Sequence, residues 1–257
     1  MSQVALTKMH GAGTDFDVLD ATAQPLPPLE AVAKRIADRH FGIGCDQVLV
    51  VERPTKGTDA DFRMDIYNAD GSRVEMCANG IRAFYKYLRD HGHTTRDEVR
   101  VETLGGVVVP RHGGEGRVIV DMGHPVLEPA KIPTRLGSGD GPVLDAELRV
   151  DGTTYRASSV SMGNPHCVIE VADLDAFPVG VVGPKIEHHD AFPNRVNVEF
   201  IDVVARDRIR QRTWERGTGE TLACGSGACA VAVSAMLRGA VDRSVAVELR
   251  GGELRIE

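Results

Sequence analysis

The chain of 257 residues repeats itself, and this repeat constrains the possible fold more than any other feature of the sequence. Cys77 in "MCANGIRAF" recurs 147 positions later as Cys224 in "ACGSGACAV", and a small, glycine-bearing turn follows each cysteine. Farther along, "VRVETLGGVVV" (99–109) matches "VAVELRGGELR" (245–255) at an offset of 146. Several matches in the same order at nearly one offset predict two structurally equivalent halves.

Local patterns place strands before each cysteine and a helix after it. The β-branched or alternating runs "DQVLVVE", "FRMDIYN" and "RVIVDM" have strand length. Apolar residues at helical spacing run from Cys77 to a stop near Gly92, and again from Cys224 to Gly239. A further amphipathic helix is expected in "LEAVAKRIADRH" (29–40). These patterns predict an α+β fold with two pseudo-symmetric halves, each a mostly antiparallel sheet or barrel around a central helix.

The boundary between the halves is expected in the stretch rich in Pro and Gly at 123–143. We therefore expect an N-terminal half over 1–122 and a C-terminal half over 144–257. After its "GG" the first half continues through "GRVIVDMGHPV", whereas the second half ends at Glu257, five residues past Gly252. The C-terminal half is accordingly expected to lack the usual final strand.

Composition and charge exclude several classes of protein. The formal net charge is −7 without a basic run, which argues against a nucleic-acid partner. No apolar stretch approaches the roughly 18 residues that a membrane span needs, and the N-terminus has no signal-peptide pattern. We expect a cytoplasmic protein whose five cysteines stay reduced. The sequence has no complete dinucleotide loop and no Cys-x-x-Cys or His-Glu-x-x-His, so neither a cofactor nor a metal is expected.

A cysteine at the start of a helix has a specific chemistry. The unpaired N–H groups and the helix dipole lower the thiol pKa from about 8.5, and the same N–H groups can hold a carboxylate. The small residues of "ANG" and "GSG" let a ligand approach the backbone closely. Two such turns, facing each other across a cleft, suit a reaction in which a thiolate removes a proton beside a carboxylate and a thiol returns one to the opposite face. This arrangement predicts a cofactor-independent racemase or epimerase.

Seven motifs, spread over nearly the whole chain, resemble those of the diaminopimelate epimerase family of PLP-independent, two-cysteine enzymes. They are "TKMHGAGTDF", "HFGIGCDQ", "YNADGSRVEMCANGIR", "SMGNPHCV", "NRVNVEF", "WERGTGETLACGSGACA" and "VELRGGELRIE". The resemblance implies the duplicated fold and the conversion of LL-2,6-diaminopimelate to meso-diaminopimelate in lysine and peptidoglycan precursor synthesis. It also implies a small-molecule substrate, a homodimer, and no nucleic-acid or membrane partner.

The resemblance further implies roles for individual residues. Cys77 and Cys224 would act as base and acid, exchanging roles with the direction of the reaction, while His166 and Glu215 would support catalysis without carrying the proton. The backbone clamps on the reacting carboxylate would be Ala78-Asn79 and Gly225-Ser226. Contacts with the rest of the substrate would come from Thr14, Gln47, Asn68, Asn164, Asn197, Glu215 and Arg216. An arginine in that set can hold a carboxylate bidentately.

Departures from the family pattern keep alternatives open. Thr14 stands where the family usually has Asn, Ala78 replaces a usual Gly, and Ala83 replaces a usual Cys. Thr14 in particular leaves room for a PLP-independent racemase of another amino acid on the same scaffold. Proline-racemase-like enzymes usually carry a His where this chain has Asn79, and isomerases of the phenazine-synthesis type use no cysteine pair. From a different class, a non-catalytic thiol or zinc-binding module remains the alternative.

Overall fold

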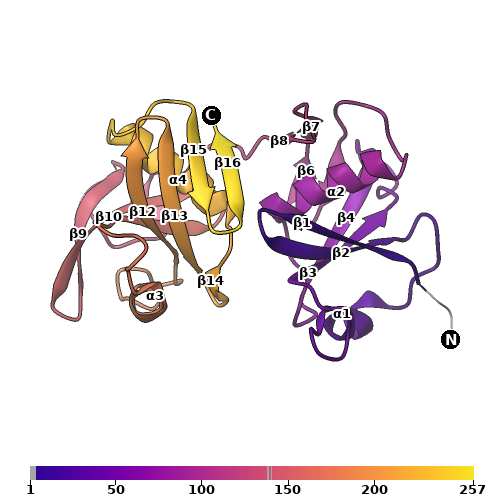
Figure 1. The fold of residues 1–257 in the computed structure, drawn as a ribbon, viewed down its shortest axis with the longest axis horizontal. Coiled ribbons are helices and arrows are strands. Elements are labelled where there is room, and N and C mark those ends of the chain that lie inside the picture. The colour runs from indigo at the N-terminus through magenta and orange to yellow at the C-terminus, as the bar shows by residue number, and fades with distance from the viewer. Residues whose placement is uncertain (1–3, 138, 140) are drawn as a thin grey trace. The chain divides into compact units, whose positions relative to one another are not determined.

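The structure is a computed structural model that describes residues 4–137, 139 and 141–257. The chain divides into two compact units, of which unit 1 ends at Asp121 and unit 2 begins at Met122 (Figure 1). Each unit is built on its own sheet. Among the described residues, no helix is long and apolar enough to cross a membrane.

Unit 1 contains a six-stranded sheet in the order β1-β2-β3-β4-β5-β6. Neighbouring pairs alternate between antiparallel and parallel, starting with the antiparallel pair β1-β2. The strands are β1 (Leu6–Gly11), β2 (Thr14–Asp20), β3 (Gln47–Glu52), β4 (Phe62–Asn68), β5 (Val101–Thr103) and β6 (Gly106–Val108). Helix α2 (Ala78–Asp90) packs against β1, β2 and β3, and a hairpin of β7 (Pro110–His112) and β8 (Val118–Val120) packs against α2.

The alternation of side chains explains why this sheet is covered on both faces. Leu49 and Val51 of β3 belong to the cluster that packs on α2, whereas Val48 and Val50 pack with α1 (Leu29–Ala37). Because successive strand residues point to opposite faces, the two helices lie on opposite sides of the sheet. A run with apolar residues on both faces is typical of a strand buried in this way.

The boundaries of two expected elements are shorter in the structure. The helix expected over 29–40 ends at Ala37, because the carboxylate of Asp38 accepts the N–H groups of His40 and Phe41 at 2.8 Å each and turns the chain. The strand expected over 117–122 is confined to Val118–Val120. Both differences lie at element ends, where local hydrogen bonds compete with the regular pattern.

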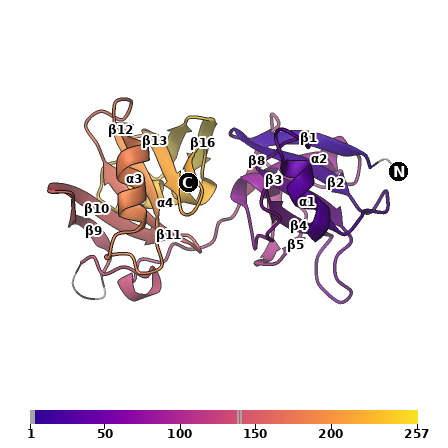
Figure 2. The same cartoon turned by 90° about the horizontal axis from the view of Figure 1, so that it is seen from below.

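Unit 2 repeats this design in a larger sheet, with the order β16-β15-β13-β12-β11-β10-β9 and β14 paired with β13. The strands are β9 (Val143–Val150), β10 (Thr153–Ser161), β11 (Pro165–Glu170), β12 (Asn197–Ala205), β13 (Arg208–Glu215), β14 (Gly219–Thr221), β15 (Val245–Leu249) and β16 (Gly252–Ile256). Helix α3 (Val179–Glu187) packs on one face (Figure 2) and α4 (Gly225–Leu237) on the other. A short 3-10 helix, Pro129–Lys131, precedes the sheet.

The two units are structurally equivalent, as the repeat predicts. Strands β1 to β6 with α2 correspond to β10, β11, β12, β13, β15 and β16 with α4, and both sets alternate antiparallel and parallel pairs in the same order. The register agrees residue by residue: Phe16 is paired with Gln47 in unit 1, and His166 is paired with Asn197 in unit 2. The α+β class and the pseudo-symmetric halves are therefore confirmed.

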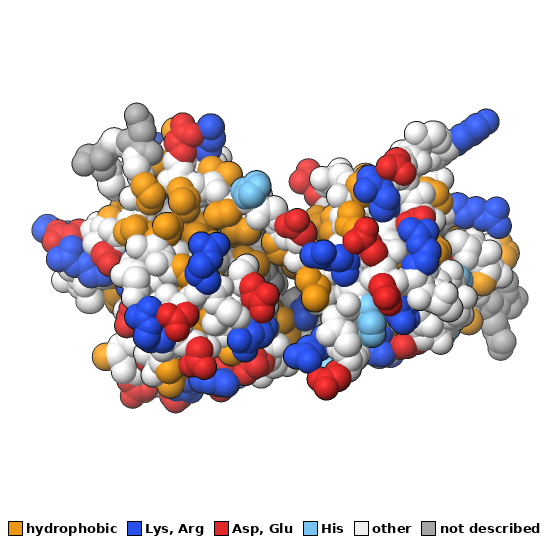
Figure 3. Space-filling model, turned by 90° about the horizontal axis from the view of Figure 1, so that it is seen from above, with side chains coloured by type: hydrophobic (Ala, Val, Ile, Leu, Met, Phe, Trp, Pro, Cys, Tyr) orange, Lys and Arg blue, Asp and Glu red, His pale blue; other side chains and the backbone are white. Residues whose placement is uncertain are grey.

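The two central helices differ in their surroundings. Helix α2 buries one side and exposes a charged side that includes Lys86 and Asp90, whereas α4 has no charged residue between Gly225 and Leu237. Hydrophobic side chains gather on the part of unit 2 that Figure 3 presents, while charged side chains dominate the part of unit 1 in the same view. The repeat thus preserves the fold, although the side chains on it have diverged.

Candidate functional site

Both cysteines singled out by the repeat cap the N-terminus of a central helix. Cys77 is the N-cap of α2, with extended backbone angles, and its Sγ accepts the N–H of Gly80 at 3.3 Å. Cys224 is the N-cap of α4, with nearly the same angles, and its Sγ accepts the N–H of Gly227 at 3.4 Å. We name residues 77–80 the first cysteine turn and residues 224–227 the second cysteine turn. Each turn places a thiol beside the backbone N–H groups of a helix start.

The first cysteine turn is tied to β1 and β2. The amide of Asn79, which is buried, donates to Thr14 Oγ1 at 2.9 Å and accepts a hydrogen bond from the guanidinium of Arg82. Gly11 allows this approach, since a Cβ there would lie only 3.1 Å from the carbonyl oxygen of Asn79. The structure therefore brings together Thr14 and Asn79, which are 65 positions apart in the chain.

Two further residues from the sequence prediction form a pair in unit 1. Gln47 and Asn68 lie opposite each other on β3 and β4, and Gln47 Nε2 donates to Asn68 Oδ1 at 3.0 Å. Asn68 Nδ2 donates in turn to Ser72 Oγ at 3.0 Å. Among the described residues, Gln47 Oε1 is buried and has no hydrogen-bond partner, which leaves an acceptor available to a ligand.

The second cysteine turn lies over a buried polar group that unit 1 lacks. His166 Nδ1 is 2.8 Å from Glu199 Oε1, and both side chains are fully buried. The other ring nitrogen, Nε2, is 3.0 Å from Asn164 Oδ1. Ser226 Oγ lies 3.4 Å from the thiol of Cys224. The structure thus joins the predicted residues Asn164 and His166, and it adds Glu199, which the sequence prediction missed.

Asn197 organises the segment that carries Glu215 and Arg216. Its Oδ1 accepts the backbone N–H of Arg216 at 2.9 Å, and its Nδ2 donates to the carbonyl of Pro165 at 3.1 Å. Thr221 Oγ1 donates to Glu215 Oε1 at 2.6 Å, which orients that carboxylate. The guanidinium of Arg216 donates to a backbone carbonyl at 3.1 Å, so its head is held at one nitrogen and keeps further donors.

A second buried carboxylate supports the same segment from α3. Glu187 accepts hydrogen bonds from Trp214 Nε1 at 2.8 Å and from the N–H of Gly217 at 2.9 Å. It therefore fixes the turn on both sides of Glu215 and Arg216. Sequence reasoning did not find Glu187, because nothing in the pattern of α3 links it to a turn 30 positions away.

The pKa of Cys224 departs from the value expected for a thiol at a helix start. Burial raises the pKa well above its usual range, and the nearby carboxylates of Glu215 and Glu199 raise it further. Hydrogen bonds from Ser226 and Gly227 act in the opposite direction but are weaker causes. The expected lowering of the thiol pKa at a helix start is thus wrong for Cys224, since desolvation outweighs the hydrogen bonds at the start of the helix. Burial likewise raises the pKa of Cys45 to about 12, as expected for an inert core thiol.

The predicted site residues are divided between the two units. Unit 1 holds Thr14, Gln47, Asn68, Cys77, Ala78 and Asn79. Unit 2 holds Asn164, His166, Asn197, Glu215, Arg216, Cys224, Gly225 and Ser226. Within the parts of the chain that the structure describes, no group of three or more His, Cys, Asp or Glu side chains could hold a metal ion.

Comparisons with known proteins identify the family of the chain. The family model of diaminopimelate epimerase matches residues 6–128 and 158–257. The diaminopimelate epimerase of Aromatoleum aromaticum is 51% identical over 250 residues, which cover 97% of this chain and 89% of that protein. A hydroxyproline epimerase from Agrobacterium vitis shares the fold, with a TM-score of 0.66 and 17% identity, over 97% of this chain and 81% of that chain. A PhzF-family protein from Bacillus anthracis also shares the fold, with a TM-score of 0.69 and 17% identity, over 99% of this chain and 90% of that chain. On sequence and fold together, the chain belongs to the diaminopimelate epimerase family.

Proposed function

We propose that the chain catalyses the cofactor-independent epimerisation of LL-2,6-diaminopimelate to meso-diaminopimelate. Membership of the family supports the reaction class, and the relative from Aromatoleum aromaticum bears the name of this activity. The observation that carries the mechanism is the duplicated N-cap cysteine, with a thiol at the start of an equivalent helix in each unit. We place the reaction in the cytoplasm of a cell that makes lysine, with a homodimer as the working form.

In this mechanism the two thiols act on one substrate carbon from opposite faces. One cysteine, as thiolate, removes the proton from the carbon beside the carboxylate, and the other cysteine, as thiol, delivers a proton to the opposite face. Cys77 and Cys224 exchange the roles of base and acid with the direction of the reaction. After each turnover the cysteine that acted as base carries a proton and the cysteine that acted as acid lacks one. Proton exchange with water restores the starting state of both.

The backbone of the two cysteine turns stabilises the intermediate. Proton removal makes the substrate carboxylate enolate-like and increases its negative charge. The N–H groups of Ala78-Asn79 and Gly225-Ser226 belong to helix starts, and their dipoles interact more strongly with the carboxylate as that charge grows. No cofactor is needed for this stabilisation, because the helix starts supply the positive potential.

The remaining polar residues select the distal end of the substrate. The amides of Asn68, Asn164 and Asn197 offer donors and acceptors for an amino-acid group, and Arg216 offers a guanidinium for its carboxylate. Amino acids without a second ammonium-carboxylate end would make fewer contacts with this set of polar groups. This set supports diaminopimelate over smaller substrates.

The activity is tested by incubating LL-diaminopimelate with the reduced protein in D2O, without PLP or added metal. We expect deuterium at the α-carbon together with meso product, observed by NMR. The same substrate without protein is the control. Absence of both exchange and meso product from a folded, reduced sample would reject the proposal, and a panel of other amino acids would then identify the racemase substrate that Thr14 leaves open.

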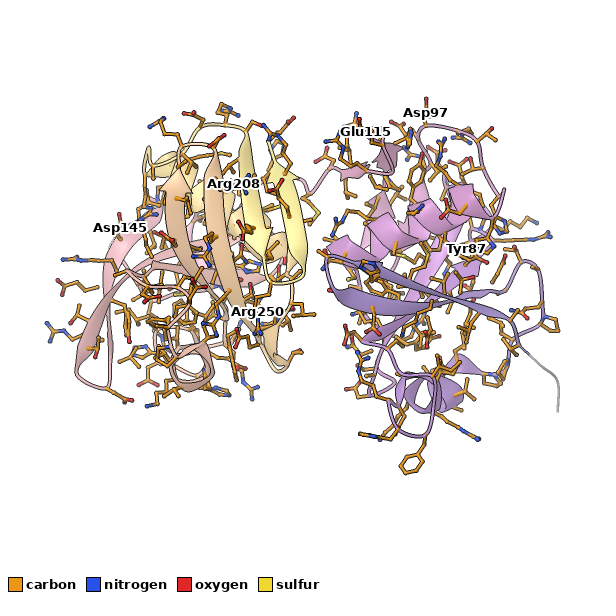
Figure 4. The ribbon with its side chains drawn as sticks, in the orientation of Figure 1. Tyr87, Asp97, Glu115, Asp145, Arg208 and Arg250 are labelled. Atoms are coloured by element: carbon orange, nitrogen blue, oxygen red, sulfur yellow. The ribbon has the colours of Figure 1, made fainter. Side chains whose placement is uncertain are left out.

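The role of Arg216 is tested by Arg216→Ala. Loss of a charge-assisted, bidentate contact costs about 1.5–3 kcal/mol, so KM for diaminopimelate should rise about 10- to 100-fold. Arg208, labelled in Figure 4, is a matched control at the start of β13, the strand that ends one residue before Arg216, and its half-exposed guanidinium pairs with Glu248 and Glu253. Arg208→Ala is expected to keep the original KM. Equal KM values for both variants would show that Arg216 does not bind the distal end of the substrate.

A further inference from the structure

The sheet side chains that lie beneath each cysteine turn, which we call the floor of that turn, differ between the units, although the backbone is equivalent. On the side of the unit 1 sheet that packs against α2, the residues are the apolar Phe16, Leu49, Met64 and Ile66. The strand registers place at the equivalent positions of unit 2 the polar His166, Glu199, Gln211 and Thr213. All eight side chains are at least 98% buried. The residues beneath the first cysteine turn are therefore apolar, and those beneath the second are polar.

The glycines of the two turns measure how close this floor lies. A Cβ at Gly80 would lie 3.3 Å from Leu49 Cδ2, whereas a Cβ at Gly227 would lie 2.7 Å from Glu199 Oε1 and 3.1 Å from Gln211 Nε2. The same Gly227 donates its N–H to the thiol of Cys224. The backbone of Gly227 thus lies between the Glu199 carboxylate and the sulfur of Cys224.

We infer that Glu199 is a positioning residue for the second cysteine turn: its buried carboxylate orients His166 and makes the surroundings of Cys224 unlike those of Cys77. This role rests on the proposed function, in which Cys224 is one of the two acid–base groups. A carboxylate accepts only, so His166 Nδ1 carries a proton and donates it to Glu199 Oε1; this bond fixes the orientation of the ring, with Nε2 at 3.0 Å from Asn164 Oδ1.

The contacts of Glu199 indicate that it does more than fill space. Oε1 is bound to His166, while Oε2 is buried and has no hydrogen-bond partner among the described residues. A buried carboxylate with one unsatisfied oxygen is costly, whereas Leu49 at the equivalent position of unit 1 fills the same place without that cost. The charged and titratable groups that face Cys224 are Glu199 from β12 and Glu215 from β13, with His166 of β11 bound to Glu199.

Two substitutions separate the effect of the charge of Glu199 from the effect of its side-chain length. Glu199→Gln keeps the shape and removes the charge, so the alkylation of Cys224 by iodoacetamide should have its midpoint at lower pH and proceed at least about threefold faster at neutral pH. Glu199→Asp keeps the charge and withdraws the oxygens by one methylene, so Cys224 should remain slow to alkylate. For both variants kcat is expected to fall about 10- to 100-fold, because His166 loses its charged partner in Glu199→Gln and its close hydrogen bond in Glu199→Asp. Peptide mass spectrometry follows Cys77 and Cys224 separately, and Cys77 should not change.

The matched control is Glu248→Gln, which makes the same charge change at an exposed position of β15. It should leave kcat and both alkylation profiles unchanged. A structural defect would accelerate all buried thiols together, whereas the proposal requires a change at Cys224 alone. An unchanged Cys224 profile in Glu199→Gln, or unchanged kcat in both variants, would overturn it. Alkylation needs no substrate, so failure of the proposed function, seen as full turnover by Cys224→Ala, is distinguishable from failure of this inference.

Discussion

Replacing either Cys77 or Cys224 by alanine is expected to lower kcat for the interconversion of LL- and meso-diaminopimelate by at least about 10³-fold. Positioned acid–base groups contribute about 10²- to 10⁴-fold each, and a two-base mechanism fails when either face of the carbon has no proton donor or acceptor. The effect on folding should be small, near 1 kcal/mol, because alanine fills most of the space of a small thiol. Activity by chiral product analysis and thermal unfolding of the same samples measure the two quantities.

The control for these variants is Cys45→Ala. Cys45 is a buried thiol of the cluster on α1, and its raised pKa of about 12 makes it inert. It should therefore retain the original kcat. A variant with only one of the two N-cap thiols that still forms the opposite epimer at the original rate would contradict the two-base mechanism. Deuterium exchange into one epimer without inversion would instead support it, because a single thiol can serve one face.

Gly227→Ala is expected to have the next largest effect, a loss of about 10²-fold in kcat/KM and about 1–3 kcal/mol in stability. The new Cβ would lie 2.7 Å from Glu199 Oε1, and this oxygen cannot retreat freely because it is bound to the buried His166. The start of α4 must therefore move, and Cys224 moves with it, since its Cβ lies 3.2 Å from the same position. Steady-state kinetics and thermal unfolding test both parts of the prediction.

Substitutions of two other glycines serve as controls for Gly227→Ala. Gly80→Ala is the equivalent change in unit 1, where the nearest contacts are 3.2–3.4 Å and include the flexible end of Leu49, so a smaller loss is expected. Gly180 in α3 has no atom within 4 Å of a Cβ, and Gly180→Ala should be neutral. If Gly227→Ala behaved like Gly180→Ala, the close approach of Glu199 to the second cysteine turn would be refuted.

Much of the fold could be predicted because its signals are local or periodic. The alternation in "FRMDIYN" corresponds to β4, and the helical spacing after Cys77 and Cys224 corresponds to α2 and α4. Element ends were less predictable: the helix over 29–40 stops at Ala37, where Asp38 caps the next turn with its own side chain. Such short-range competition is decided by a single side chain, and periodicity does not contain it.

Part of the candidate site could likewise be predicted from the sequence, and part required the structure. The helix starts at Cys77 and Cys224 follow from sequence, since a cysteine before a small, glycine-bearing turn and an apolar helical run defines an N-cap position. The link from Thr14 to Asn79 and the support of Arg216 by Asn197 required the structure, because strand pairing brings together residues far apart in the chain.

The sequence by itself determined the duplication, the α+β class and the presence of a thiol at the start of each central helix, because these depend on repeated residues and on local periodicity. Only the tertiary structure decided what surrounds each thiol. It places Leu49 under the first cysteine turn and Glu199 with His166 under the second, and it buries Cys224 so that the pKa rises instead of falling. Desolvation and the Coulomb field of buried carboxylates depend on how distant segments pack, so two equivalent helix starts acquire different chemistry.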